Sequence, residues 1–305
     1  MLSEKPWRAD AILRLGVSVM MCIFIGTLAM SSLRFLHGGR KNPILFFSAT
    51  AAASGFCAGA LWLLRRPLSA EKFRRQFLTL LVCIYAGLCL MWISMRLSGP
   101  AHSSANEMSL AEVVISSLSL QGALLALVPG FLRQHQIGFT EAFGLKSGWK
   151  KALLFGAIMA AVFWPVGRGL QAVSLEIMKL VHLEPQEQIL VQLLRATEAW
   201  PNRLILGAVA VVIAPAAEEI VFRGILYPAV KQRGFPGLAL WSTSLLFGLI
   251  HFNLPSFLPL VVLSLVLTWL YEKTNNLLAP IATHSLFNAA NFAALYYMQS
   301  KSGQS

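Results

Sequence analysis

Acidic residues are scarce in this 305-residue chain, and aspartate is almost absent. The sequence has 13 Asp and Glu against 25 Lys and Arg, and charged residues make up 12% of it while hydrophobic residues make up 56%. This charged share is about half that of an ordinary soluble domain, which excludes a disordered chain and argues against a soluble one. Asp10 is the only aspartate, so the sequence cannot supply the two aspartates of an aspartyl protease.

Other catalytic and structural signatures are missing as well. No HExxH sequence occurs, which excludes the metal-binding helix of zincin metalloproteases. Ser54 lies in an apolar run, but Ala52 stands where a rhomboid-type serine site has glycine, which disfavours a serine mechanism. The cysteines all lie in apolar runs and predict neither a disulfide framework nor a CxxC metal site. They are Cys22, Cys57, Cys83 and Cys89.

Long uncharged runs fill most of the sequence and predict membrane-spanning helices. The runs cover residues 15–33, 42–64, 76–95, 113–132, 152–167, 204–217, 234–271 and 274–300. A spanning helix needs about 20 apolar residues, and the two short runs reach this length by extending past single ionisable sites. The longest run breaks at Asn253, Leu254 and Pro255 and forms two helices. We therefore predict an all-α, polytopic membrane helix bundle with about nine transmembrane helices, or eight.

The basic residues predict how the chain is oriented. With nine spans, 15 of the 25 Lys and Arg lie on the side of the N-terminus and 9 on the other side, with Arg223 inside a helix. The positive-inside rule therefore places the N-terminus of this multi-pass membrane protein in the cytoplasm. The basic residues form short clusters between apolar runs, so we expect the lipid bilayer as a partner and no nucleic acid. The charged segment 168–203 is expected in a loop or at the membrane interface.

Two adjacent glutamates lie deep inside an apolar stretch, in the sequence IAPAAEEIVFRGILYP. A charge at mid-membrane costs about 2.5–3.5 kcal/mol on insertion scales, so Glu218 and Glu219 need partners or a task. Glu219 and Arg223 are four residues apart on one helix face and are expected to form an ion pair, which is more often structural than catalytic. Glu218 is rotated by about 100° from Glu219 and has no such partner in its own helix.

Two histidines and an amide lie at a similar depth. His251 follows Phe247 by one turn in FGLIHFN, and His284 and Asn288 share one helix face in HSLFN. From the helix rise, the two histidines and Glu218 lie roughly 15–20 Å from the polar ends of their helices, near the middle of a core about 30 Å thick. Each histidine alone would be a packing contact, and Asn288 alone an interhelical hydrogen bond. With the unpaired Glu218 they supply a general base and polar groups for an oxyanion.

The stretches EEIVFR, FGLIH and HSLFN occur in this order and resemble three motifs of one protein family. These are the EExxxR, FxxxH and HxxxN motifs of the CAAX protease and bacteriocin-processing family of intramembrane proteases, also called the Abi family. The resemblance covers roughly residues 149–297. It implies a protease domain over residues 141–305, and it leaves residues 1–140 as N-terminal accessory transmembrane helices without a motif.

The resemblance also implies roles for these residues. Glu218 and His251 would activate a water, and His284 and Asn288 would stabilise the oxyanion. The residues expected to give structural support are Glu219, Arg223 and Phe247.

The cofactor, the substrate and two rival functions stay open. A metal-free glutamate mechanism and a metalloprotease mechanism are both compatible with the motifs, the latter with a divalent metal such as zinc on Glu218, His251 and His284. The family implies membrane-embedded, prenylated or otherwise lipidated peptide or protein substrates, and nothing in the sequence selects among them. The alternatives are a membrane transporter and a non-catalytic membrane scaffold that use the same buried polar residues. The sequence shows no repeated half of the kind common in transporters.

Overall fold

The computed structural model describes residues 3–36, 51, 55, 110–146, 148–185, 187–197, 199–251 and 253–302. All regular structure in these ranges is helical, which confirms the predicted all-α class. Five helices are long and apolar enough to cross a membrane: Ala9–Met30, Leu110–Gln134, Trp149–Leu180, Trp200–Lys231 and Leu254–Thr274. Outside the described residues lie the predicted span 76–95, the predicted span 42–64 except for residues 51 and 55, Ser54 and three of the four cysteines. The total of eight or nine spans therefore stays a prediction.

The chain divides into two compact units, Asp10–Ala123 on the one hand and Met1–Ala9 with Leu124–Ser305 on the other. In the first unit the structure describes α1 (Ala9–Leu36), α4 (Leu110–Ser117) and the π-helical turn η1 (Leu118–Gly122). A Cβ on Gly26 would lie 1.7 Å from Ser119 Oγ, so α1 and η1 pack closely. The domain boundary at residue 140 and the accessory role of the N-terminal helices stay predictions.

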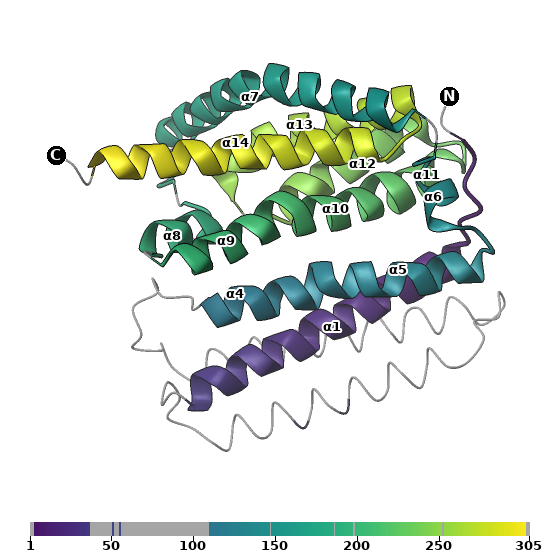
Figure 1. Cartoon of the computed structure of the whole chain (residues 1–305), viewed down its shortest axis with the longest axis horizontal. Helices are drawn as coiled ribbons and strands as arrows, with labels where there is room; N and C mark the ends of the chain where they lie inside the picture. The colour runs from purple at the N-terminus through teal and green to yellow at the C-terminus, as the bar shows by residue number, and fades with distance from the viewer. Residues whose placement is uncertain are drawn as a thin grey trace. The chain divides into compact units, whose positions relative to one another are not determined.

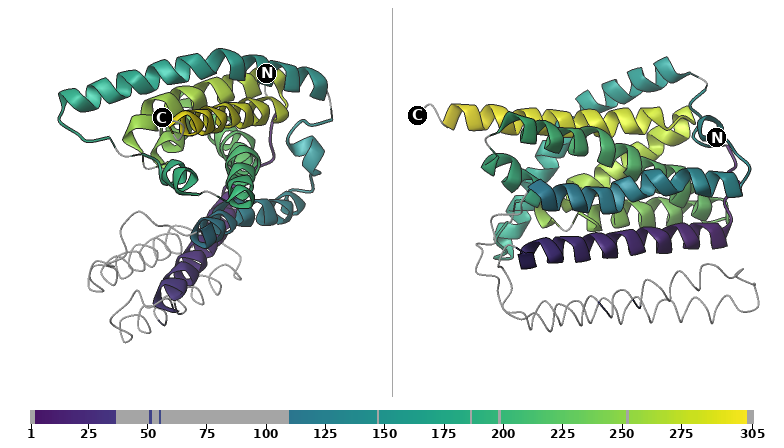
Figure 2. Two further views of the ribbon diagram at one scale, coloured as in Figure 1. Left: turned by 60° about the vertical axis from the view of Figure 1, so that its left-hand side comes forward. Right: turned by 60° about the horizontal axis from the view of Figure 1, so that its bottom comes forward.

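The second unit, called the motif unit below, is a bundle of helices that carries all three motifs (Figure 1). α7 (Trp149–Leu180) packs against α13 (Leu254–Thr274) and α14 (Leu278–Ser302), and the views of Figure 2 show α7 and α14 side by side. The shorter helices are α5 (Ala123–Gln134), α6 (Phe139–Ala142), α8 (Ile189–Ala196) and α12 (Pro236–Leu249). The charged segment 168–203 is not all loop, because it begins inside α7, which ends at Leu180.

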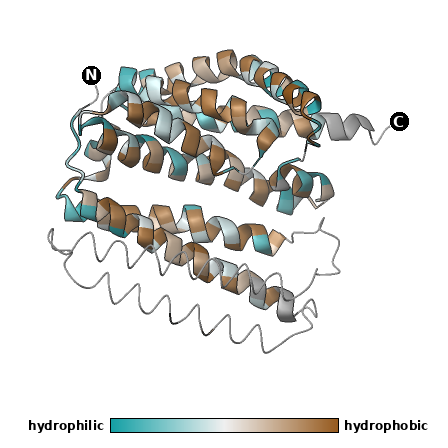
Figure 3. Cartoon of the chain, turned by 180° about the vertical axis from the view of Figure 1, so that it is seen from behind, coloured by the Kyte–Doolittle hydropathy of each residue, from teal (hydrophilic) through white to brown (hydrophobic). Residues whose placement is uncertain are grey.

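Small residues bring α7 close to α14. Ala152, Gly156 and Ala160 are buried at a spacing of four residues, and a Cβ on Gly156 would lie 2.7 Å from the Ala279 carbonyl oxygen. Thr283 Oγ1 donates to Gly156 O at 3.0 Å. Small residues towards neighbouring helices and large apolar residues towards lipid are the pattern of a membrane helix, and apolar residues, brown in Figure 3, cover these helices. The apolar residues exposed on the other face of α7 include Leu154, Ile158, Val162 and Val166.

Residues 200–231 form one continuous helical path with two π-helical turns. Its parts are α9 (Trp200–Ala208), η2 (Val209–Ile213), α10 (Ala214–Glu219), η3 (Ile220–Leu226) and α11 (Tyr227–Lys231). In η2, Ala214 N–H donates to Val209 O, five residues back rather than four. Each π turn lies just before a proline, Pro215 or Pro228, whose ring would clash with the carbonyl four residues earlier in a regular α-helix. The prolines therefore account for both departures from α-helical hydrogen bonding.

The longest apolar run forms two helices, as predicted. α12 ends at Leu249 and α13 begins at Leu254, where Asn253 Oδ1 accepts a hydrogen bond from Ser256 N–H at 3.1 Å. The 14 residues of α12 give a length of about 21 Å, shorter than a hydrocarbon core of about 30 Å. The turn that contains His251 therefore lies about 21 Å from the start of α12 beside Arg233. Wherever such non-helical backbone lies inside a hydrocarbon core, it must be buried in protein or line a water-filled cavity.

The N-terminal residues 3–8 are not helical and lie against the motif unit to which they belong. Trp7 is 7% exposed, and its Nε1–H donates to Gly224 O at 2.9 Å. The α-helical donor for this carbonyl would be the backbone nitrogen of Pro228, which carries no hydrogen. Trp7 therefore supplies a side-chain donor to a carbonyl that has lost its α-helical donor, and its ring centroid lies 5.1 Å from that of Phe131.

Candidate active site

Glu219 and Arg223 form the buried ion pair that the sequence predicts. Glu219 Oε1 lies 2.8 Å from Arg223 Nη1, and the two side chains are 0% and 1% exposed. Arg223 also donates from Nη2 to Ser264 Oγ at 2.7 Å and from Nε to Thr268 Oγ1 at 3.4 Å. Sequence reasoning missed these two partners on α13. Their signal was present, since two hydroxyl residues four apart in an apolar run lie on one helix face.

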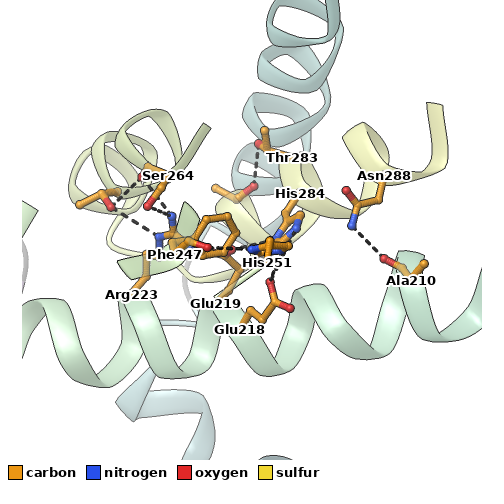
Figure 4. Close-up of polar contacts among 12 residues, drawn as sticks. Ala210, Glu218, Glu219, Arg223, Phe247, His251, Ser264, Thr283, His284 and Asn288 are labelled. Atoms are coloured by element: carbon orange, nitrogen blue, oxygen red, sulfur yellow. Dashed lines mark hydrogen bonds and ion pairs between the residues drawn. The ribbon is translucent and has the colours of Figure 1, made fainter. Parts of the chain in front are cut away.

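Glu219 also binds His284, a contact that the motifs do not reveal. Glu219 Oε1 lies 2.9 Å from His284 Nδ1, so one carboxylate oxygen serves both Arg223 and His284 (Figure 4). His284 is 2% exposed. Because an ionised carboxylate only accepts hydrogen bonds, the proton of neutral His284 lies on Nδ1, and Nε2 carries a lone pair. Glu219 thus joins the ion pair of the motif helix to the histidine of α14.

Glu218 faces both predicted histidines (Figure 4). Its Oε2 lies 4.0 Å from Nε2 of His251 and 4.0 Å from Nε2 of His284. This oxygen is buried, and no group in the described ranges forms a hydrogen bond with it. Both nitrogens are too distant for direct hydrogen bonds, and a buried carboxylate oxygen without a donor is costly. At separations of 4.0 Å, one small polar molecule can bridge the Glu218 carboxylate and the two imidazoles.

His251 presents the same ring atom to Glu218 as His284 does. Its Nδ1 lies 2.7 Å from Phe247 O, and because a carbonyl only accepts, Nδ1 carries the proton and Nε2 the lone pair. The two histidines differ in exposure, which is 24% for the His251 side chain and 2% for that of His284. His251, in the turn after α12, is therefore the more exposed of the two histidines that face Glu218.

Phe247 lies at the centre of the cluster and is 0% exposed. Its ring centroid is 5.0 Å from that of His251, 5.6 Å from that of His284 and 4.8 Å from Arg223 Cζ. The ring thus holds both imidazoles in place and stacks near the guanidinium, which favours the cation electrostatically. This position fits the supporting role that the motif implies.

Asn288 follows His284 by one turn on α14, as predicted, and its amide contacts the main chain of the motif helix. Asn288 Nδ2 donates to Ala210 O at 2.9 Å (Figure 4). The nitrogen carries two hydrogens, so this bond uses one and leaves the other for a further acceptor. The structure therefore brings Glu218, His251 and His284 together and places Asn288 one helical turn from His284, with its amide bonded to η2.

The donor chemistry of the cluster suits a divalent metal, but its spacing does not. Donor atoms 2.0–2.2 Å from a tetrahedral zinc ion lie about 3.4 Å apart. Here Glu218 Oε2 lies 4.0 Å from each histidine Nε2, and no group of three His, Cys, Asp or Glu among the described residues is placed to hold a metal ion. A water oxygen about 2.8 Å from both Glu218 Oε2 and a histidine Nε2 spans the 4.0 Å between them, with an angle of roughly 90° at the water. Metal binding by Glu218, His251 and His284 thus stays a prediction.

Comparisons with known proteins bear out the family resemblance of the motifs. Residues 200–290, which contain all three motifs, match the family of type II CAAX prenyl endopeptidases described as Rce1-like. The chain is 31% identical over 85 residues to the UPF0177 protein YxdF of Lactococcus lactis. It is 29% identical over 99 residues to the "putative membrane peptidase YdiL" of Bacillus subtilis, and 34% identical over 77 residues to the uncharacterized protein YpbD of the same species.

The similarity is confined to part of each protein. The matches cover 28, 32 and 24% of this chain and 46, 38 and 36% of the three relatives, in the order given. The chain thus spans less than half the length of the relatives it matches. No solved structure matches the chain significantly.

Proposed function

We propose that this chain, with its Rce1-like region over residues 200–290, is an intramembrane endopeptidase that hydrolyses membrane-associated, prenylated or otherwise lipidated peptides. One observation carries the proposal: Glu218 Oε2 lies 4.0 Å from Nε2 of His251 and of His284, and both imidazoles are held in the tautomer that leaves Nε2 unprotonated. The apolar helices support a membrane setting, and the similarity to CAAX prenyl endopeptidases supports the substrate class.

In the proposed reaction, Glu218 and the two histidines hold the attacking water. All three groups are acceptors, so the water donates its two hydrogens among them and turns a lone pair towards the peptide carbonyl carbon. Glu218 takes one proton as the oxygen attacks, and it passes this proton to the amine nitrogen when the C–N bond breaks. Product acid and amine then leave, and the carboxylate is restored.

The oxyanion needs hydrogen-bond donors, and this separates the roles of His284 and Asn288. Neutral His284, with its proton directed to Glu219, has only a lone pair at Nε2, so we assign it to the water together with His251. Asn288 keeps one N–H beyond the bond to Ala210 and is the donor for the developing charge. Removing one such donor typically lowers kcat by about 10²–10³-fold.

The test uses the purified full-length chain in lipid nanodiscs with a quenched fluorescent peptide that ends in a farnesylated CAAX sequence. We expect cleavage by the wild-type chain and a loss of about 10²–10⁴-fold in Glu218→Gln, which keeps the shape and removes the basicity. The matched control is Glu176→Gln, because Glu176 is 68% exposed on α7 and should be dispensable.

A second arm does not depend on the choice of peptide. Membrane proteins and secreted peptides are compared between cells that express the wild-type chain and cells that express Glu218→Gln. Cleavage products that need Glu218 support the protease. Identical profiles, together with an uncleaved farnesylated peptide, would leave the transporter and scaffold alternatives and overturn the proposal.

A further inference from the structure

We propose that Pro215 is a positioning residue for Asn288. Pro215 interrupts α-helical hydrogen bonding in η2, the interruption frees the Ala210 carbonyl, and this carbonyl fixes the orientation of the Asn288 amide. The catalytic consequence rests on the proposed function, whereas the contact itself does not.

Ala210 O has lost both backbone donors that a helix can offer. In an α-helix its donor would be Ala214 N–H, but this group donates to Val209 O instead. In a π-helix its donor would be the nitrogen of residue 215, which is proline and carries no hydrogen. A carbonyl inside a helix bundle in a membrane has no bulk water to turn to, so it needs a side-chain donor. Asn288 Nδ2 supplies that donor at 2.9 Å.

Contacts on both sides of Asn288 fix the helix that carries it. One turn earlier, His284 Nδ1 is bound to Glu219 Oε1 at 2.9 Å. One turn later, Phe292 packs against Gly207, where a Cβ would lie 3.4 Å from the ring. The backbone of α14 is therefore held against α9 and α10, and the remaining freedom of Asn288 is the rotation of its own side chain.

The Ala210 carbonyl removes that last freedom and decides which end of the amide is available. A carbonyl attracts the NH₂ group and repels the amide oxygen, so it selects one of the two amide orientations. The second hydrogen of Nδ2 then stays available as a donor. A freely rotating amide would present its oxygen part of the time, and an oxygen repels an oxyanion.

Pro215→Ala should release Asn288 without unfolding the helix. Alanine provides an N–H that can bond Ala210 O in the π pattern, or it allows the α pattern in which Ala214 N–H does so. Either bond competes with the Asn288 amide. The helix itself should not weaken, since proline is the least favourable residue in a helix interior and alanine the most favourable.

The contact is tested by NMR on the full-length chain, labelled with ¹⁵N-asparagine, in detergent micelles. The side-chain NH₂ signal of Asn288 is assigned by its absence in Asn288→Ala. We expect Pro215→Ala to shift this signal and Pro228→Ala to leave it in place. Pro228 is the matched control, because it follows the π turn η3, and Gly224 O, the carbonyl that loses its α-helical donor there, accepts a hydrogen bond from Trp7. An Asn288 signal unchanged in Pro215→Ala overturns the proposal, whether or not the chain is a protease.

The catalytic consequence is tested with the farnesylated CAAX peptide. We expect Pro215→Ala to lower kcat at least tenfold with little change in KM and with a thermal midpoint no lower than that of the wild type. The double variant Pro215→Ala/Asn288→Ala should lose no more activity than Asn288→Ala alone, because Pro215 acts through Asn288. Additive losses, or a loss of thermal stability that accompanies the loss of activity, would overturn the proposal. A shifted NMR signal, together with an uncleaved peptide and identical proteome profiles, would instead support the contact and refute the protease.

Discussion

Replacing Glu219 with glutamine should destabilise the protein far more than the same change at its neighbour Glu218. Glu219 Oε1 binds both Arg223 Nη1 and His284 Nδ1, and all three side chains are at most 2% exposed. Glu219→Gln leaves the Arg223 guanidinium buried with hydroxyl partners but without the carboxylate that is hydrogen-bonded to it. Breaking one side of a buried ion pair costs about 3–5 kcal/mol, which lowers the ratio of folded to unfolded protein roughly 10²- to 10⁴-fold.

Glu218→Gln is the matched comparison. No described group donates a hydrogen bond to Glu218 Oε2, and an amide is less costly to bury than a carboxylate. We expect a thermal midpoint equal to or above that of the wild type, together with loss of peptide cleavage. Thermal unfolding in one detergent, abundance in the membrane and turnover are measured for both variants. A Glu219→Gln protein as stable as the wild type, or a Glu218→Gln protein with near-normal turnover, would refute the assignment.

A double change separates the two contacts of Glu219. Changing Glu219 and Arg223 together to leucine removes both charges, so part of the stability lost in Glu219→Leu should return. Activity should not return, because His284 Nδ1 has still lost the acceptor that sets its tautomer. Recovery of both properties would mean that Glu219 acts through Arg223 alone.

Three other features of the chain give predictions of their own. Trp7→Phe keeps an aromatic ring at this position but leaves Gly224 O without its indole donor, so the thermal midpoint should fall with a loss of about 1–3 kcal/mol in the free energy of unfolding. An unchanged midpoint would contradict the role of that hydrogen bond. The 4.0 Å separations around Glu218 predict that purified protein is active without stoichiometric metal, whereas one metal per chain, with activity lost in chelator and restored by zinc, would contradict this. Arg233→Cys, in a chain without other cysteines, should react with a membrane-impermeant reagent only from the cytoplasmic side. Labelling of this cysteine in intact cells would contradict the predicted orientation.

The sequence predicts best those features of the site that depend on a single helix. The pair of Glu219 and Arg223 follows from their spacing of four residues, and it forms although Arg223 lies in a π turn. The proximity of Glu218 to the two histidines follows from their similar estimated depth in the membrane, because all spanning helices of one protein cross the same two membrane surfaces. The turn at Asn253 follows from the adjacent proline and capping side chain.

Features that depend on how helices are rotated against one another were not predictable. The bond from His284 to Glu219 and the bond from Asn288 to Ala210 both depend on how α14 is rotated about its axis. That rotation is set by close approach at glycines such as Gly156, which no periodicity in a uniformly apolar helix reveals. The prolines after η2 and η3 did carry a signal, since a proline inside a spanning helix always leaves one carbonyl without its usual donor.

The two π turns also affect how insertions and deletions act on this site. A π turn is an α-helical turn with one residue more, so deleting a single residue within 209–213 would straighten the helix there. The residues that follow would keep nearly their present directions, because the π turn takes up its extra residue locally. Deleting one residue from the regular α-helical stretch 214–217 would instead rotate everything after it by about 100°, which is the angle between the directions of Glu218 and Glu219. A one-residue gap within 209–213 in a relative's sequence is therefore compatible with the same active site, whereas a gap within 214–217 exchanges the neighbours that the two glutamates face.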